Sequence, residues 1–223
     1  MAFDGVVLAV DVGGTNVKVL ASGQAERRRA PSGPTLTPTE MVAAAKAAAG
    51  EWQWDVVSVG VPAPVRDGRV VTEPANLGTG WIGFDFEAAF GKPTKVTNDA
   101  AMQALGSYEG GKMLFLGLGT GLGSALVLNG LVEPMEIAHL PFKKGTFEDY
   151  LGERGWQRLG KPRWEKNVHE AVEKLTAALD PDYLVLGGGN AAKLVTLPPS
   201  CRLGNNNNAF IGGFRLWDPV ETS

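Results

Sequence analysis

The sequence has few of the residues that build disulfides or zinc sites. Its 223 residues include one cysteine, Cys201, and two histidines, His139 and His169. A single thiol excludes an internal disulfide framework and a multi-cysteine zinc cluster. Because tetrahedral structural zinc sites are usually built from Cys and His, we expect no structural zinc.

A long apolar run and an excess of positive charge are also missing. No run reaches the ~20 apolar residues that a membrane-spanning helix needs. The N-terminal stretch MAFDGVVLAVDVGG has no basic segment of the kind that opens a signal peptide. The formal net charge is −3 at pH 7, so no basic stripe is available for a nucleic-acid backbone. We therefore expect a cytoplasmic protein that binds neither membranes nor nucleic acids.

Two common phosphate-binding fingerprints are absent as well. The sequence contains no G-x-x-x-x-G-K-[ST] loop. The stretch GLGTGLG, from Gly117, approaches the G-x-G-x-x-G spacing, but Leu122 stands where the third glycine belongs. A strand is predicted after it, whereas a dinucleotide site needs a helix there. These features disfavour a dinucleotide-binding protein.

What the sequence does contain is an apolar hairpin broken by glycine, and it contains it twice. The two copies are LAVDVGGTNV (8–17) and LFLGLGTGLGSALVLNG (114–130). Aligning the breaks places Gly13, Gly14 and Thr15 on Gly119, Thr120 and Gly121. The repeat suggests two duplicated α/β halves with a cleft between them. We predict domains at 1–100 and 101–223, with the final helix able to pack back on the N-terminal domain.

Periodicity and capping residues predict the other elements. Strands are expected at 6–10, 17–21, 55–65 and 182–189, and a short one in TKVTNDA. Helices are expected in TPTEMVAAAKAAAGEW, where Thr37 and Glu40 form a capping box, from Asp99 onward, and in PRWEKNVHEAVEKLTAAL. Further helices are expected after the glycines at 187–189 and near the C-terminus. The arginines at 27–29 suggest a solvated face.

The glycine breaks have the composition of phosphate-binding turns. Glycine lets the backbone approach a ligand, and successive N–H groups in a turn form an anion-binding concavity. Thr15 and Thr120 add hydroxyl donors. Hairpin geometry alone would also require glycine, but the duplication and the aspartate before the first break favour phosphate binding.

Asp11 stands at the end of the first apolar strand, where a carboxylate needs a partner. A buried carboxylate costs several kcal/mol unless it is paired or binds a metal. Beside a phosphate the natural partner is Mg²⁺, so we predict that Asp11 holds Mg²⁺. Lys18, in the next strand, is expected either to pair with Asp11 or to reach the phosphates.

Several short motifs then occur in an order that resembles one family. DVGGTNVK, GVPAP, NLGTGW, TNDA, GLGTGLGSAL, EIAH and LGGG are similar to the motifs of the ROK sugar kinases, which share the actin and hexokinase (ribonuclease-H-like) fold. The resemblance runs from about residue 6 to 217. The stretches GLVEPMEIAH, WEKNVHEAVEKLTAALDPDYLVLGGG and NNNNAFIGG resemble the polyphosphate glucokinase branch most.

This resemblance implies roles for individual residues. Asp99 would be the general base on the sugar hydroxyl, although its place at a helix start also suits an N-cap. Sugar contacts are implied for Asn76, Asn98, Glu136, His139 and Glu148. The nucleoside side of a donor would face Gly187, Gly188 and Gly189. From the residues alone a core histidine is the default interpretation of His139, whereas Trp81 could equally stack on a sugar or belong to the core.

The segment LPFKKGT, between His139 and Glu148, departs from the family because it lacks the zinc-binding cysteines. The connection over 140–160 is also short, which weakens the assignment of Glu148. Basic residues gather in and after this segment, as a track for polyphosphate or as a solvated surface: Lys143, Lys144, Arg154, Arg158, Lys161 and Arg163.

We therefore expect a two-domain hexose kinase that transfers a phosphoryl group from polyphosphate or ATP to a sugar, with glucose O6 as the favoured acceptor. Mg²⁺ is the expected cofactor and a homodimer the expected assembly. The alternatives are a kinase for another hexose or an N-acetylhexosamine, and a sugar-binding ROK regulator without catalysis.

Overall fold

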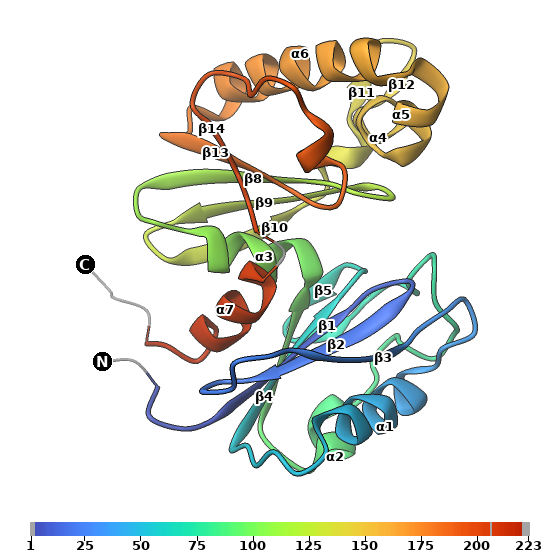
Figure 1. The fold of residues 1–223 in the computed structure, drawn as a ribbon, viewed down its shortest axis with the longest axis vertical. Helices are drawn as coiled ribbons and strands as arrows, with labels where there is room; N and C mark the ends of the chain where they lie inside the picture. The colour runs from blue at the N-terminus through green and yellow to red at the C-terminus, as the bar shows by residue number, and fades with distance from the viewer. Residues whose placement is uncertain (1–2, 206, 220–223) are drawn as a thin grey trace. The chain divides into compact units, whose positions relative to one another are not determined.

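The computed structural model describes residues 3–205 and 207–219, which form two compact units. Unit 1 takes in the chain up to Gly106 and from Asn207 onward, and unit 2 runs from Ser107 to Asn206. Within the described ranges each unit is built on one five-stranded sheet (Figure 1). The mixed α/β architecture predicted from the sequence is confirmed.

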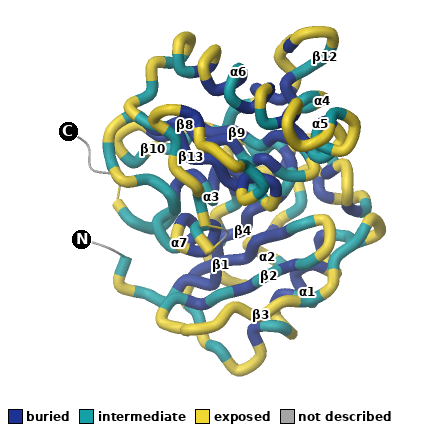
Figure 2. The backbone as a smooth tube through the Cα atoms, turned by 45° about the horizontal axis from the view of Figure 1, so that its top comes forward, coloured by how far each residue is buried: buried dark blue, intermediate teal, exposed yellow. Residues whose placement is uncertain are grey.

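The sheet of unit 1 has the strand order β3-β2-β1-β4-β7. Its strands are β1 (Val7–Val12), β2 (Asn16–Ala21), β3 (Arg28–Pro31), β4 (Val56–Val61) and β7 (Thr94–Asn98). The first three pair antiparallel, whereas β1, β4 and β7 are parallel neighbours. The central strands β1 and β4 are buried along their whole length (Figure 2), which explains their unbroken apolar sequences.

Helices cover both faces of this sheet (Figure 1). On one side lie α1 (Pro38–Ala49), which begins with the predicted Thr37–Glu40 capping box, and the short α2 (Phe86–Phe90). On the other lie α3 (Asp99–Ser107) and α7 (Asn208–Arg215). Those two cross at glycines, since a Cβ on Gly212 would stand 1.7 Å from the carbonyl oxygen of Met102. A small hairpin, β5 (Val65–Arg66) and β6 (Arg69–Val70), completes the unit.

The sheet of unit 2 has the order β10-β9-β8-β13-β14. Its strands are β8 (Lys112–Leu118), β9 (Leu122–Leu128), β10 (Leu131–Met135), β13 (Tyr183–Gly187) and β14 (Cys201–Leu203). One face packs on α4 (Phe147–Leu151), α5 (Glu153–Leu159) and α6 (Lys161–Leu179). The remaining elements are the 3₁₀ turns η1 (Ile137–His139) and η2 (Ala191–Lys193) and the ribbon β11 (Pro141–Phe142) and β12 (Gly145–Thr146).

Both glycine-broken hairpins form as the sequence predicts, as β1–β2 and β8–β9. The predicted helix after the glycines at 187–189 is only the three-residue turn η2. The arginine stretch expected to be a solvated face is largely exposed, but Arg28 and Arg29 also lie in the edge strand β3. Within the described residues no helix combines the length and the apolar character needed to cross a membrane.

Candidate active site

Parallel strands bring two carboxylates to the same edge of the sheet in unit 1. Asp11 is the next-to-last residue of β1, and it lies beside Gly60 of β4. Asp99 follows β7 and is the first residue of α3. Because the carboxyl ends of parallel strands share one edge, the two aspartates come close together. Gly60 makes room for this, since a Cβ there would lie 3.4 Å from the Cα of Asp99 and 2.5 Å from Met102 Cε.

Asp11 has a cationic partner in the neighbouring strand. The register of β1 and β2 places Lys18 directly opposite, and its Nζ lies 2.9 Å from Asp11 Oδ2. The Asp11 side chain is 9% exposed and that of Lys18 32%. Of the two roles that the sequence left open for Lys18, the structure shows pairing with Asp11.

The carboxyl group of Asp99 lies in an environment that favours its protonated form. Burial, and then repulsion by the Asp11 carboxylate, raise the pKa of Asp99 to about 7, against the opposing effects of backbone N–H donors and of Lys18. A side chain whose pKa lies close to neutrality is suited to accept and return a proton. The pair therefore has the electrostatics of an acid–base site.

The side chain of Asn98 caps the start of α3, a role that also suits Asp99. Its Oδ1 accepts hydrogen bonds from the N–H groups of Ala100 and Ala101, at 2.9 and 3.3 Å. Its Nδ2 donates to the carbonyl oxygen of Ala63. Asp99 Oδ1 accepts a hydrogen bond from the N–H of Ala100, at 2.8 Å. Because Asn98 already caps the start of α3, helix capping alone does not account for the aspartate.

The first glycine turn, Gly13–Thr15, is exposed at Gly14 and Thr15. It is closed by the N–H of Gly13, which donates to the carbonyl oxygen of Asn16. Asn76 lies beside it, because a Cβ on Gly14 would stand 3.4 Å from Asn76 Cβ. The structure thus brings Asn76 to the turn, although the two are about sixty residues apart in the sequence.

The loop that carries Asn76 is held by a residue that sequence reasoning missed. The carboxylate of Glu73 accepts hydrogen bonds from the N–H groups of Gly80 and Trp81, each at 3.1 Å. Trp81 itself is fully buried, and its indole N–H donates to the carbonyl oxygen of Leu36. Trp81 therefore belongs to the core, which is one of the two roles that the sequence allowed.

The second glycine turn, Gly119–Gly121, lies at the carboxyl edge of the sheet in unit 2. β8 and β13 are parallel there, with Gly117 beside Gly187, so the turn neighbours the glycines at 187–189. Asn190 joins them, since its backbone N–H donates to Leu118 O and its Nδ2 to Gly119 O. Gly188 has a φ of +80°, and a Cβ there would stand 2.4 Å from Leu118 O.

A side chain of α4 and a backbone N–H of α5 complete this second turn. Glu148 Oε2 accepts a hydrogen bond from the N–H of Leu122 at 3.3 Å, and a Cβ on Gly121 would stand 2.5 Å from the same oxygen. The N–H of Glu153 donates to the carbonyl oxygens of Gly119 and Thr120. Despite the short connection over 140–160, Glu148 therefore lies next to Gly121, a predicted site residue.

Glu136 and His139 lie close together, as their spacing predicts. His139 Nε2 is 3.6 Å from Glu136 Oε2, and both side chains are more than half exposed. Glu136 directly precedes η1 and His139 is its last residue. Next to the turn, the N–H of Phe147 in α4 donates to the carbonyl oxygen of Leu140. His139 is therefore not a core histidine.

Two of the basic residues expected to form a polyphosphate track have partners within the protein. Lys143 Nζ pairs with Glu170 at 2.8 Å and donates to Asn167. Arg158 donates to the carbonyl oxygen of Asp149 and lies over the Tyr150 ring. These contacts stabilise the segment that replaces the zinc loop.

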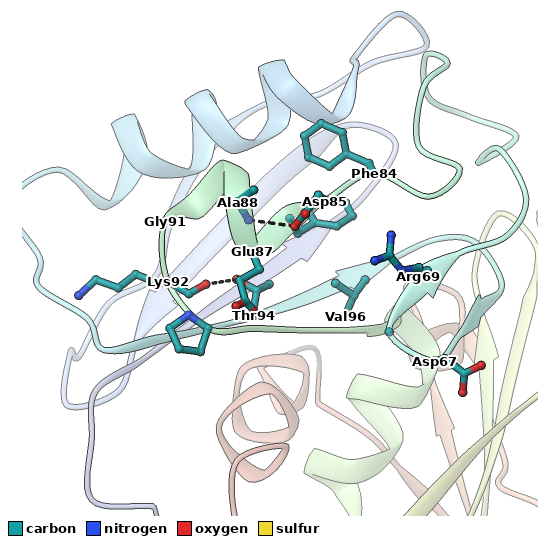
Figure 3. A pocket seen from close by; sticks show the side chains of 13 residues that line it. Asp67, Arg69, Phe84, Asp85, Glu87, Ala88, Gly91, Lys92, Thr94 and Val96 are labelled. Atoms are coloured by element: carbon teal, nitrogen blue, oxygen red, sulfur yellow. Dashed lines mark hydrogen bonds between the residues drawn. The ribbon is translucent and has the colours of Figure 1, made fainter.

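A hollow of about 640 Å³ on the surface of unit 1 is separate from these residues. It lies between α2, the start of β7 and the β5–β6 hairpin, with Arg69 and Lys92 among its lining residues (Figure 3). None of the predicted site residues lines it. The hollow is therefore separate from the site residues predicted in unit 1.

The donor set at the first turn has the chemistry of a magnesium site. Among the described residues no group of three or more His, Cys, Asp or Glu is placed to hold a metal. Mg²⁺, however, usually takes only one or two carboxylates together with water and substrate phosphates. The Asp11 carboxylate, beside the exposed Thr15 turn, therefore fits Mg²⁺ that is shared with a phosphorylated ligand.

Comparison with known proteins gives one family and a consistent fold. The model of the ROK family matches residues 7–133. A polyphosphate glucokinase of Mycobacterium tuberculosis is 27% identical over 206 residues, covering 82% of this chain and 77% of the relative.

Two solved structures share the fold. An inorganic polyphosphate/ATP-glucomannokinase from Arthrobacter sp. strain KM has a TM-score of 0.81 at 22% identity, over 95% of this chain and 97% of that one. A ROK family glucokinase from Streptomyces griseus, in complex with glucose and AMPPNP, has a TM-score of 0.73 at 17% identity, over 96% and 99%. The actin and hexokinase-like fold expected from the motifs is thereby confirmed.

Proposed function

Since the chain belongs to the ROK family, we propose that it is a sugar kinase that transfers a phosphoryl group from polyphosphate or ATP to glucose at O6. The observation that carries the proposal is Asp99, whose pKa of about 7 reflects its burial beside Asp11. A general base works best when its pKa lies near the operating pH.

In the proposed reaction Asp99 aims the sugar hydroxyl and accepts its proton as the oxygen bonds to phosphorus. The bond from phosphorus to the donor's bridging oxygen breaks, and the shortened donor leaves with the electron pair. Phosphoryl transfer depends mainly on positioning and on neutralising charge. Asn76 and Asn98 would bind sugar hydroxyls in unit 1, and Glu136, His139 and Glu148 would do so in unit 2.

The glycine turns would bind the donor through their N–H groups and threonine hydroxyls, with Gly187–Gly189 beside the second turn. Asp11 would hold Mg²⁺, which neutralises phosphate charge when it is bound. Lys18 Nζ holds the Asp11 carboxylate in place through its 2.9 Å ion pair.

The donor and the sugar are proposed from the relatives. The Mycobacterium relative is named as a polyphosphate glucokinase, and the Arthrobacter protein as a polyphosphate/ATP glucomannokinase. We therefore propose polyphosphate as a donor at least as good as ATP. A kinase for another hexose or for an N-acetylhexosamine, and a sugar-binding regulator without catalysis, are the competing functions.

A phosphorylation screen that crosses a panel of sugars with polyphosphate and ATP tests the proposal. We expect turnover with Mg²⁺, with glucose as the best acceptor, and with polyphosphate at least as good as ATP. Best turnover with another hexose or an N-acetylhexosamine would change the substrate. Sugar binding by calorimetry without turnover from either donor would favour the regulator and overturn the kinase.

A further inference from the structure

Lys193, which the sequence did not single out, stands beside the second glycine turn. It is the last residue of η2, and η2 follows the glycines at 187–189 and Asn190. Its Nζ lies 3.5 Å from the centroid of the Trp156 ring and 3.6 Å from Glu153 Oε2. Glu153 in turn donates its backbone N–H to the carbonyl oxygens of Gly119 and Thr120. The lysine is therefore part of the surroundings of the turn.

The two groups that Lys193 touches are a pair suited to a nucleoside. An aromatic face stacks on any nucleobase, and an acidic side chain is a common partner of ribose hydroxyls. Lys193 Nζ lies at van der Waals distance from the Trp156 face, where a base would stack. The same ammonium group neutralises Glu153, whose pKa is lowered chiefly by the Asn190 side chain and further by Gln157 and Lys193.

Two glycines next to the second turn have open space around them. Within unit 2, a Cβ added at Gly119 or at Gly189 would meet no described atom within 4 Å. The Lys193 and Glu153 side chains are each about one-third exposed, at 34% and 31%. A ligand at the turn can thus reach the ammonium group, which is a donor of charge-assisted hydrogen bonds to phosphate.

We propose that Lys193 determines donor specificity: it covers the nucleoside-binding surface formed by Trp156 and Glu153, and it supplies a cation to a chain of phosphates. This proposal rests on the proposed function, because it assigns the donor to the second glycine turn. Polyphosphate gains a cation from Lys193 and needs no aromatic surface. ATP must displace the lysine to reach the ring.

Two substitutions separate the two effects. Lys193→Met removes the charge but leaves a long side chain over Trp156, whereas Lys193→Ala removes both. Lys174→Met is the matched control, because Lys174 is another lysine of unit 2 with a carboxylate partner, Glu170 at 4.0 Å. Among the contacts of the described residues none joins Lys174 to the turn. The readouts are kcat/KM with each donor, and the affinities for tripolyphosphate and ADP from calorimetry with Mg²⁺.

With Lys193→Met we expect polyphosphate use to fall roughly tenfold, the scale of one lost charge-assisted hydrogen bond, while ATP use stays unchanged. With Lys193→Ala we expect the same loss for polyphosphate and a gain for ATP of roughly fivefold or more, the scale of one base stacking on a ring. The control should match the wild type. Higher salt should make polyphosphate use by the wild type and by Lys193→Met more alike, because salt screens the lysine charge.

An unchanged ratio of tripolyphosphate to ADP affinity in both Lys193 variants would overturn the proposal, and so would equal losses for both donors. These binding ratios do not depend on turnover. If the wild type phosphorylates no sugar, the proposed function fails, whereas the ratios still decide whether Lys193 selects the donor.

Discussion

The two glycine turns share a backbone pattern but differ in the charges around them. Counted back from its first glycine, the first turn has Asp11 where the second has Gly117. Across the ladder, Asp11 pairs with Lys18, whereas Gly117 pairs with Gly123. The first turn is thus built around a half-buried ion pair next to Asp99, and the second offers only glycine backbone at the equivalent position.

The polar and charged residues around the second turn come from distant parts of the chain. Glu148 and Glu153 come from α4 and α5, and Asn190 and Lys193 from η2. The comparison suggests a division of work, in which the first turn supplies the base and the metal ligand. The second supplies a cradle whose specificity depends on side chains brought to it by the fold.

The largest expected effect is on the first turn, at the base. Asp99→Asn keeps the shape of the side chain and removes the proton acceptor, so turnover should fall by ~10²–10⁴-fold. Sugar affinity, measured by calorimetry, should stay within about tenfold of the wild type, because this substitution removes no binding surface. Turnover above a tenth of the wild-type value would remove Asp99 from the role of base.

Asp11→Ala should lower turnover by more than about 10²-fold and raise the Mg²⁺ concentration needed for half-maximal rate, since a metal ligand is lost. The fold should persist, because Lys18 is 32% exposed and can be hydrated. Thermal unfolding provides the control. A collapse of the melting transition would mean that the Asp11–Lys18 pair is structural and not catalytic.

The pH dependence should report Asp99. Because the pKa of Asp99 is raised from 3.8 to about 7, kcat/KM should rise about tenfold per pH unit below that value and level off above it. Stability should run the other way. Between those two pKa values the folded state binds the extra proton, so stability falls as pH rises from about 4 to about 7.

Asp99→Asn should flatten both curves. The measurements are initial rates at saturating donor and chemical unfolding across the same pH range. A wild-type rate that does not change between pH 5.5 and about 8 would contradict the raised pKa of Asp99.

A smaller effect is expected at the second turn, where two glycines form a matched pair. A Cβ on Gly121 would collide with Glu148 Oε2, whereas one on Gly119 would meet nothing within 4 Å. Gly121→Ala should therefore displace Glu148 and weaken sugar binding by roughly three- to tenfold, the loss of one hydrogen bond to a charged group. Gly119→Ala should leave sugar affinity unchanged in the same calorimetric assay. Equal losses of sugar affinity in the two variants would contradict the role of Glu148 as a sugar ligand.

Much of the first turn could be predicted because its parts are local in sequence. Asp11 and Lys18 are seven residues apart, so the hairpin itself pairs them. The resemblance then supplied Asp99, and the parallel order of β1, β4 and β7 explains why it lies near Asp11. Apolar runs broken by glycine likewise sufficed for both hairpins, and apolar residues at helical spacing sufficed for α6.

The second turn could be predicted only in part, because its neighbours are set by tertiary packing. The sequence predicts a full helix after the glycines at 187–189, where the structure has only η2 with Lys193. The residues around Lys193 in the sequence do not indicate Trp156 as its partner. Lys143 is among the basic residues expected to bind polyphosphate, yet its partner Glu170 lies on α6. Charge composition shows which residues are basic, but not which of them the fold has already paired.

The measurement that tests the central claim most directly is ³¹P NMR of the products formed from glucose, Mg²⁺ and polyphosphate or ATP, with wild type and Asp99→Asn run in parallel. We predict that the wild type yields a phosphate monoester on the primary hydroxyl of glucose and that Asp99→Asn yields almost none in the same time. Release of inorganic phosphate without any sugar phosphate, from either donor, would contradict the account.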